Sequence, residues 1–557
     1  MVGIIIRRSE APTALPSVSN VIGGNMARRA KQGMVCGLIL LGTLLAGEPG
    51  SAGRIGREVS VKRHLADDEE FTLPMPELIE HGKRLFVANW TDQEGAGRPL
   101  VKGNGRKLSD SSQPLTGARR FNRISGPDAN SCAGCHNSPY GIPGGGGDFA
   151  TSAFIGGYRF DFLTFDAADD VPTRGARDES GKLVTLQTAA NRRATAGLFG
   201  AGYIEMLARQ ITADLQAIRS SIKLGQTKEL RSKNISFGKL TRRKDGLWDI
   251  SEVQGIPRTS LVTNTSLDPP NLILRPWRQS GSAISLREYT NDSYNQHLGI
   301  QSAERFGTNT DQDGDGITNE LTRADVTAVT LYQAAMAVPG RVIPNDRAVE
   351  AAVLLGEARF KKIGCAACHV PQLSLESRGW VFEEPNPYNP PATLRRGEAK
   401  TIWLDLSSSL LPQPRLPVGK DAMVWVPAFT DFKLHDITSG PSDAAVEPLD
   451  MNYGTWSVNL ATGNSRFLTK RLWGCASAAT HFHHGLFTTL RAAVESHAGE
   501  ALEVRQRFDH LPPGEQDAII EFLKTLQVLP PGTHSLVVDE QYRPRVWPPA
   551  GIPRPGN

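Results

Sequence analysis

Cysteine is scarce in this 557-residue sequence, which contains only six. Cys36 lies near the N-terminus, four cysteines fall in two short clusters, and Cys475 has no obvious partner. A fold stapled by disulfides needs a denser, paired set of cysteines. The sequence therefore excludes a disulfide framework.

An excess of charge of one sign is also absent. The formal net charge is +4, and removing residues 1–52 would leave 57 Lys and Arg against 56 Asp and Glu. A nucleic-acid-binding domain carries a clustered basic surface. We therefore expect no nucleic-acid partner.

Long apolar runs are missing as well. The run from Gly33 to Ala46 has about 14 residues, fewer than the roughly 20 that span a bilayer. The flanks of this run have the features of an export signal. They are a start at Met26, basic residues at Arg28, Arg29 and Lys31, and small residues at 50–52. We expect a targeting segment at 1–52 with its true start at Met26, and a periplasmic or secreted protein. An uncleaved membrane anchor is the alternative.

The sequence does contain two motifs of the form C-x-x-C-H, at 132–136 and 365–369. Two thiols three positions apart can join the two vinyl groups of one porphyrin, and the adjacent histidine can bind its iron. A zinc knuckle is disfavoured because zinc needs four ligands and the motif supplies three. The motifs predict two covalently bound c-type haems. Their anchors would be Cys132, Cys135, Cys365 and Cys368, and their proximal ligands His136 and His369.

The surroundings of the two motifs repeat. Gly82–Phe86 precedes the first motif as Gly356–Phe360 precedes the second, and Thr195–Gly200 is echoed by Thr469–Gly474. This order predicts a mainly α-helical protein of two cytochrome c-like domains with long loops and extended connections. The expected domains and the Pro-rich tail are 53–322, 323–530 and 531–557.

Helical periodicity is clearest near the second motif. Residues 346–361 place Val349, Val353 and Phe360 on or near one stripe, and the run from Ala518 to Leu526 is also amphipathic. Residues 376–420 are rich in Pro, Gly and charge, so we expect a long surface excursion there.

A sixth ligand would decide what each iron can do, because a strong one blocks the metal and an open site admits substrate. His497 follows Leu486, Leu490 and Val494 at helical spacing, which predicts a histidine on an apolar helix face. A core histidine satisfied by hydrogen bonds is the alternative interpretation. Pocket or surface roles both stay open for the other histidines considered, His297, His435, His481, His483 and His484, with His483 preferred among the last three.

A separate stretch has the form of a calcium loop. It places oxygen-bearing side chains at positions 1, 3, 5 and 12, with Asp315 at position 7 and Gly314 at the sharp turn; the candidate ligands are Asn309, Asp311, Asp313, Asp315 and Glu320. A solvated Asp/Gly turn is the alternative. We expect a structural Ca²⁺ between the two halves.

Two motifs of this kind, duplicated, in an exported chain resemble the bacterial di-haem cytochrome c peroxidase superfamily. The chain is most similar to the di-haem oxidoreductases sometimes labelled thiol oxidoreductases, over about residues 75–530. The similarity is carried by Pro339–Val342 leading to Gly364–Pro371, and by Phe429–Asp436.

The resemblance also implies ligands. In the peroxidases, a methionine that binds the second iron lies fourteen residues after the histidine of a tyrosine-phenylalanine-histidine-aspartate-glycine stretch. Here 480–485 takes the place of that stretch, and fourteen residues beyond His483 stands His497. An iron with two histidines has a lower potential than one with histidine and methionine. Glu205 falls in the region where the family is expected to handle the protons of peroxide cleavage, and an ordinary helical glutamate is the alternative.

The function implied is a periplasmic, peroxidase-like di-haem oxidoreductase, with Glu205, His435 and His483 as candidate catalytic residues. Its partner would be a small redox protein of the cytochrome c or cupredoxin type, or a quinol-linked donor, and its substrate a peroxide. The main rival interpretation is a non-catalytic di-haem electron carrier, and a third is a partner-binding protein whose haems are chiefly structural. One fold class serves all three.

Overall fold

A computed structural model describes residues 55–97, 130–147, 152–156, 190–453, 457 and 459–549. The chain separates into the units Met1–Arg57 and Glu58–Asn557, and both C-x-x-C-H motifs belong to the second. The expected targeting segment lies outside the described residues. The boundary expected at residue 322 falls inside the second unit and stays a prediction. In the described part of the chain, no helix combines the length and apolar character that crossing a membrane requires.

The secondary structure is mixed α/β, with 31% helix and 15% strand among the described residues. The prediction of a mainly α-helical protein of two cytochrome c-like domains was therefore wrong. Strands were missed because most of them have only two to five residues. The helices of the described residues are α2 (Met75–Val87), α3 (Cys132–Cys135), α5 (Ala201–Ser220), α6 (Leu286–Ser293), α7 (Ala303–Phe306), α8 (Arg323–Ala334), α9 (Arg347–Ile363), α10 (Leu490–Glu495), α11 (Leu502–Asp509) and α12 (Pro513–Lys524).

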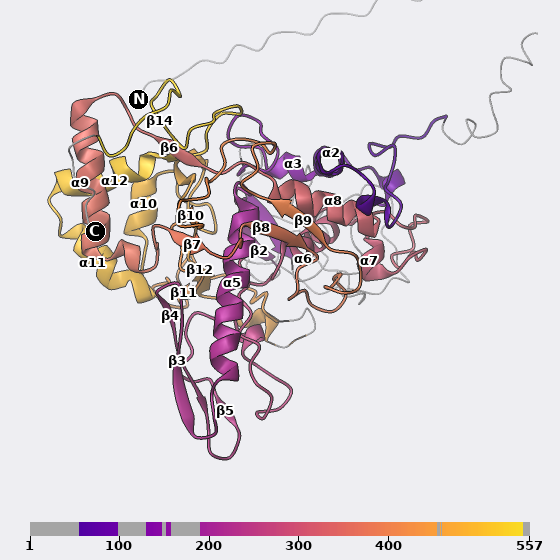
Figure 1. Cartoon of the computed structure of the whole chain (residues 1–557), viewed down its shortest axis with the longest axis horizontal. Coiled ribbons are helices and arrows are strands. Elements are labelled where there is room, and N and C mark those ends of the chain that lie inside the picture. The colour runs from indigo at the N-terminus through magenta and orange to yellow at the C-terminus, as the bar shows by residue number, and fades with distance from the viewer. Residues whose placement is uncertain are drawn as a thin grey trace, which may run out of the picture. The chain divides into compact units, whose positions relative to one another are not determined.

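The strands form small sheets of two or three members (Figure 1). Their bounds are β1 (Ser152–Gly156), β2 (Ala190–Ala194), β3 (Gln226–Ser232), β4 (Ile235–Arg242), β5 (Trp248–Asp249), β6 (Gly340–Val342), β7 (Leu373–Leu375), β8 (Val381–Glu384), β9 (Ile402–Asp405), β10 (Val424–Val426), β11 (Leu434–Asp436), β12 (Arg466–Leu468), β13 (Leu526–Gln527) and β14 (Val537–Val538). The pairs are β1–β2, β7–β10, β8–β9 and β11–β12, and the triplets are β3–β4–β5 and β13–β6–β14. The Pro-rich tail thus contributes β14, which runs parallel to β6.

Two helix pairs support the two C-x-x-C-H motifs, and each pair crosses at a glycine. A Cβ on Gly82 of α2 would lie 2.0 Å from the carbonyl oxygen of Ala328 in α8. A Cβ on Gly356 of α9 would lie 2.0 Å from the carbonyl oxygen of Ala518 in α12. Only a residue without a side chain allows such close backbone contact. The repeat seen in the sequence is therefore a repeat of helix packing.

The largest apolar core lies around α5. It includes residues from segments that the sequence did not predict to be buried. Phe382, Leu404 and Leu406 are 0%, 4% and 0% exposed and pack in this core. The expectation that residues 376–420 are a surface excursion was wrong. The strand pair β8–β9 covers this core because every second residue of β8 is buried.

Candidate functional site

The second C-x-x-C-H motif directly follows a helix end. Asp346 caps α9 by accepting hydrogen bonds from two backbone N–H groups, and Gly364 ends it with φ 106°. The short 3₁₀ turn Cys365–Ala367 comes next, and His369 follows it. The Phe360 ring lies 6.4 Å from the His369 ring. The helix predicted at 346–361 is confirmed, and it delivers the motif into an aromatic cluster.

The rings of His369 and His497 lie close together. Their ring centres are 6.4 Å apart, and the ring planes are inclined by 69°. A metal–imidazole bond is about 2.0 Å long and the ring centre lies about 1.1 Å behind the bonding nitrogen, so two imidazoles on opposite sides of one ion have centres about 6.3 Å apart. The separation therefore fits a single metal ion bound between the two rings.

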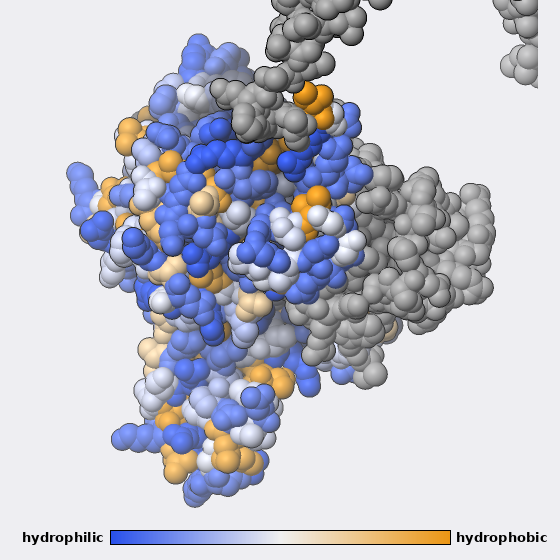
Figure 2. Space-filling model, turned by 90° about the vertical axis from the view of Figure 1, so that its right-hand side faces the viewer, coloured by the Kyte–Doolittle hydropathy of each residue, from blue (hydrophilic) through white to orange (hydrophobic). Residues whose placement is uncertain are grey.

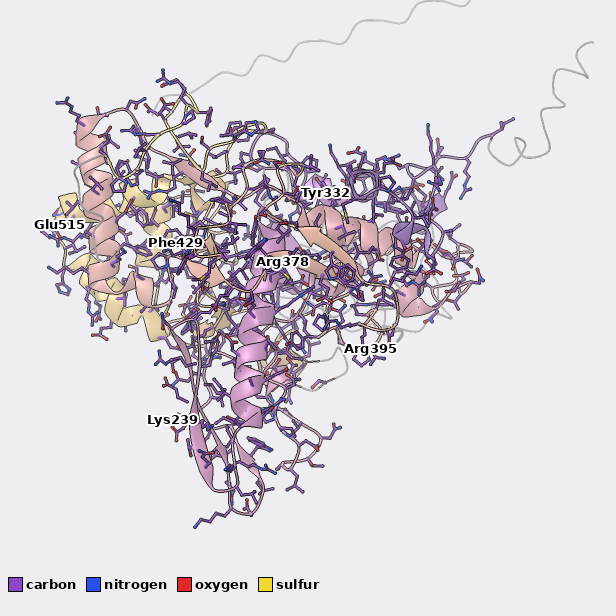
Figure 3. All side chains as sticks on the ribbon, viewed as in Figure 1. Lys239, Tyr332, Arg378, Arg395, Phe429 and Glu515 are labelled. Atoms are coloured by element: carbon purple, nitrogen blue, oxygen red, sulfur yellow. The ribbon has the colours of Figure 1, made fainter. Side chains whose placement is uncertain are left out.

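Hydrogen bonds orient both rings for such an ion. His369 donates from Nδ1 to the carbonyl oxygen of Phe429, labelled in Figure 3, at 3.2 Å. His497 donates from Nδ1 to the carbonyl oxygen of Ala493 at 2.8 Å. In metal sites the second ring nitrogen is commonly held in this way, which leaves Nε2 for the metal.

Burial keeps both histidines neutral. It lowers the pKa of His369 to about 4, helped by the neighbouring His497. It also lowers the pKa of His497 below the ordinary value. A neutral imidazole is the form that binds a metal.

The helix that carries His497 is shorter than its sequence pattern predicts. Thr489 caps α10, which runs only from Leu490 to Glu495, so His497 lies just beyond its end. Leu486 is 45% exposed and outside the helix, whereas Leu490 and Val494 pack against the cluster around Phe360. His497 thus lies beside His369 on a turn, and its predicted place on a helix face was wrong.

The first motif also forms a short turn, and a backbone carbonyl holds its histidine. The Ser131 hydroxyl caps α3 by accepting from the Gly134 N–H at 2.8 Å. His136 donates from Nδ1 to the carbonyl oxygen of Gly145 at 3.0 Å. Its ring lies 6.1 Å from that of Phe86, and burial lowers its pKa. Tyr332, labelled in Figure 3, packs on the same phenylalanine.

The repeat extends to the backbone around each ring. Backbone hydrogen bonding by Ala196 raises the pKa of His136 against the larger effect of burial. Backbone hydrogen bonding by Lys470 does the same for the pKa of His369. These two residues occupy the second position of the repeated segments Thr195–Gly200 and Thr469–Gly474. The weak sequence echo therefore corresponds to equivalent positions beside the histidines of the two motifs.

A cavity of about 240 Å³ opens beside the first motif. Cys132, Cys135 and His136 line it, and so does His297 from the single π-helical turn Tyr294–Leu298. π-Helical turns are often found at functional sites because they aim a side chain away from the regular helix face. The structure thus places His297 in the pocket, one of the two roles open for it.

Two cations inside this cavity lack an acidic partner among the described residues. Burial lowers the pKa of Lys470 to about 8 and that of Arg471 to about 10. Arg471 donates to the Gly197 carbonyl at 3.3 Å, and its Nη1 atom is buried without a hydrogen bond. A haem carries two propionate carboxylates, which would satisfy such groups. The charge of this cavity therefore suits the propionates of a haem. The repeat had marked the segment 469–474, but not these two cations as site residues.

A zinc site and a redox disulfide match the residues of the two motifs less well than covalent haem attachment does. None of the five described cysteines is in a disulfide. Within the described part of the chain, neither motif brings its own two thiols and imidazole together as a three-ligand group. One cluster combines Cys368 with Asp431 and His435. The donor sets match covalent haem attachment better than a closed zinc site.

The sites around the two C-x-x-C-H motifs share a wall. Cys475 lines the cavity of the first motif and packs against the apolar cluster that also holds Cys365. Trp473 lines the same cavity and lies against Gly200, the residue that precedes α5. The residues 470–475 therefore lie between the two sites.

The calcium-type loop brings part of its predicted ligands together. Carboxylate oxygens of Asp311, Asp313 and Asp315 lie within 4.8 Å of one another. Burial and the neighbouring carboxylates raise the pKa of Asp313 to about 7, and burial with Asp313 raises that of Glu320 to about 10. Asn309 is engaged differently, because its Oδ1 accepts from Asn319 at 2.7 Å.

Three predicted catalytic residues lie away from the cavity lining. Glu205 is fully buried in an ion pair with Arg209 and accepts from the Leu286 N–H at 2.7 Å. His435 is held between Asp431 (2.9 Å) and Glu500 (2.7 Å).

Burial opposes the charge of His435, but its hydrogen bond with Asp431 raises the pKa. His483 is stacked on Phe467 at 3.6 Å and donates from Nε2 to the Ala445 carbonyl at 2.7 Å. These contacts favour positioning roles for all three residues.

No family model and no curated protein matches the chain.

Proposed function

We propose that the chain is an exported di-haem c-type oxidoreductase whose two haems have different tasks. The second haem would be held by Cys365, Cys368, His369 and His497 and would pass electrons. The first would be held by Cys132, Cys135 and His136 and would meet the substrate. Bound haem supplies one-electron chemistry and, where an axial position is open, a place for a small substrate such as a peroxide.

The observation that carries this proposal is the 6.4 Å separation of the His369 and His497 rings, each with Nδ1 held by a backbone carbonyl. Two preset imidazoles exclude a substrate from that position. They also change little with oxidation state, which suits electron transfer.

The residues of the first cavity would bind, orient and move protons. Lys470 and Arg471 would bind the propionates and fix the ring of the cofactor. His297 is the second histidine of the described cavity lining, after His136. It would give protons to hydrogen peroxide, whose reduction to two water molecules consumes two protons and two electrons from the donor. Glu205 is unsuited to that role because its carboxylate is bound to Arg209.

The proposed partner follows from the different tasks of the two haems. An electron donor would dock near the second haem, and a small cytochrome c, a cupredoxin or a quinol-linked protein would fit this requirement. Covalent haem attachment takes place outside the cytoplasm, so the proposal includes a periplasmic or secreted location.

The test is electron paramagnetic resonance on the oxidised, purified holoprotein, with haem content measured by denaturing gel stain. Two covalent haems, with one low-spin and one high-spin iron, are expected. Two low-spin irons that persist after partial reduction would favour the electron carrier. Absence of covalent haem from protein made in a host with the haem-attachment machinery would contradict both.

A further inference from the structure

An arm built from β3, β4 and β5 extends beside α5 (Figure 1). Backbone hydrogen bonds close its far end, from Gly225 N–H to the Arg242 carbonyl (2.7 Å) and from Trp248 N–H to the Ser266 carbonyl (2.9 Å). We call the residues 221–228, 242–248 and 262–268 the tip of the arm.

The tip exposes apolar side chains on separate turns. Leu224, Val262 and Leu267 are 58%, 50% and 61% exposed. Figure 2 shows hydrophobic residues at the lower end of this projection, among hydrophilic ones. Trp248 lies half-buried beside them, with the Arg242 guanidinium 5.5 Å from its ring centre. Leucine and tryptophan flanked by cations are the composition of segments that lie in a membrane interface.

The arm also concentrates positive charge. Residues 221–258 contain nine Lys and Arg against four Asp and Glu, a net charge of +5, whereas the whole chain has +4. The rest of the chain is therefore slightly acidic. Lys223, Arg243 and Lys244 are exposed at the tip itself, and Lys239, labelled in Figure 3, projects further along the arm.

The tip is remote from the cavity of the first motif. Gly200 precedes α5 and contacts Trp473 of the cavity lining, while Ser221, at the other end of the helix, accepts from Lys228 at the tip. A helix of this length spans about 30 Å. The tip is therefore a surface separate from this cavity.

We propose that the tip docks the protein onto an anionic phospholipid surface. Its apolar side chains would enter the interface while the surrounding cations pair with lipid phosphates. A stable protein partner usually needs about 800 Å² on each side. Three apolar side chains on a narrow, convex tip do not offer such an area, whereas a lipid surface needs no matching shape.

The test is co-sedimentation of the purified holoprotein with vesicles of phosphatidylcholine containing about 30% phosphatidylglycerol, against pure phosphatidylcholine. We expect binding to the anionic vesicles only, weakened by salt. Each cation near such a surface strengthens binding about five-fold, so Lys223→Glu/Lys244→Glu is expected to lose more than about ten-fold. Leu224→Ser/Leu267→Ser is expected to lose a similar factor at unchanged charge.

The matched control is Leu410→Ser/Lys420→Glu, which alters an exposed leucine and an exposed lysine away from the arm. It should bind as the unaltered protein does, and all variants should keep their haem content. Equal binding to both vesicle types, or equal loss in the control, would overturn the proposal. Arm-dependent binding to immobilised polyglutamate without vesicle binding would also overturn it and would indicate an acidic protein partner.

Discussion

His369 and His497 lie with their ring centres 6.4 Å apart although 128 positions separate them in the sequence. The first follows α9 and a short 3₁₀ turn, and the second follows α10. Both elements pack against the same aromatic cluster around Phe360 and Phe522. The core itself therefore presets the distance between the rings.

Replacing His497 tests this pair. His497→Ala should convert one low-spin iron to high-spin in the oxidised holoprotein, because the iron would lose its sixth ligand. Electron paramagnetic resonance measures the change. The control is His510→Ala, which removes an exposed histidine at the end of α11. An unchanged ratio of low-spin to high-spin iron would exclude His497 as a ligand.

Replacing His297 tests the substrate side. His297→Ala should lower peroxide turnover about 100-fold, the usual range for loss of a positioned proton donor. The low-spin signal of the other haem should stay as it is. Gln296→Ala is the control, since Gln296 belongs to the same π-helical turn but is not part of the described cavity lining. Equal turnover in both variants would argue against proton transfer by His297.

Calcium should change how stability depends on pH. Without the ion, the raised pKa values of Asp313 (about 7) and Glu320 (about 10) mean that the folded loop holds protons that the unfolded chain releases. Stability is then fully present below about pH 4 and falls as the pH rises toward and past about 7. Bound Ca²⁺ would favour the charged carboxylates and remove this loss.

The measurement is the midpoint of thermal unfolding between about pH 5 and pH 8, with Ca²⁺ or with a chelator. The chelated protein should lose several degrees across this range, and the Ca²⁺-loaded protein should not. Asp313→Asn should make the two curves coincide. Identical curves for the unaltered protein would show that the loop binds no Ca²⁺.

The helix crossing beside the second motif should tolerate no side chain. Gly356→Ala would push a methyl group into the Ala518 carbonyl, and we expect a loss of about 3 kcal/mol in the free energy of unfolding. Gly514→Ala, on the partner helix α12, meets no atom within 4 Å and should be neutral or stabilising by up to about 1 kcal/mol. Urea unfolding of both variants measures the difference. Equal effects would mean that the helices separate easily at this crossing.

The parts of the site that depend on local spacing could be predicted from the sequence. The C-x-x-C-H motifs and the helix before Cys365 follow from short patterns, and the structure confirms the helix. The candidate ligand His497 was predicted from an apolar helix face, which the structure does not have at that position, and from the family resemblance. Lys470 and Arg471 could not be found in this way. Their importance depends on which distant segments close the cavity around them, and a single pair of adjacent basic residues carries no such information.

The fold class failed for a related reason. Short strands such as β7 and β10 pair across about fifty residues, so their stability comes from partners that local periodicity does not reveal. A helix produces one continuous apolar stripe, and a prediction built on stripes therefore overestimates helices. The calcium-type loop shows the opposite case, where the pattern brought Asp311, Asp313 and Asp315 together as expected.

The wall shared by the two sites has an evolutionary consequence. Residues 470–475 belong to the second repeat by sequence, yet all of them except Leu472 line the cavity of the first motif. A chain cut between the repeats would leave that cavity open on one side. The two halves are therefore no longer exchangeable modules, and recombination that swaps one half would have to bring residues 470–475 along with it.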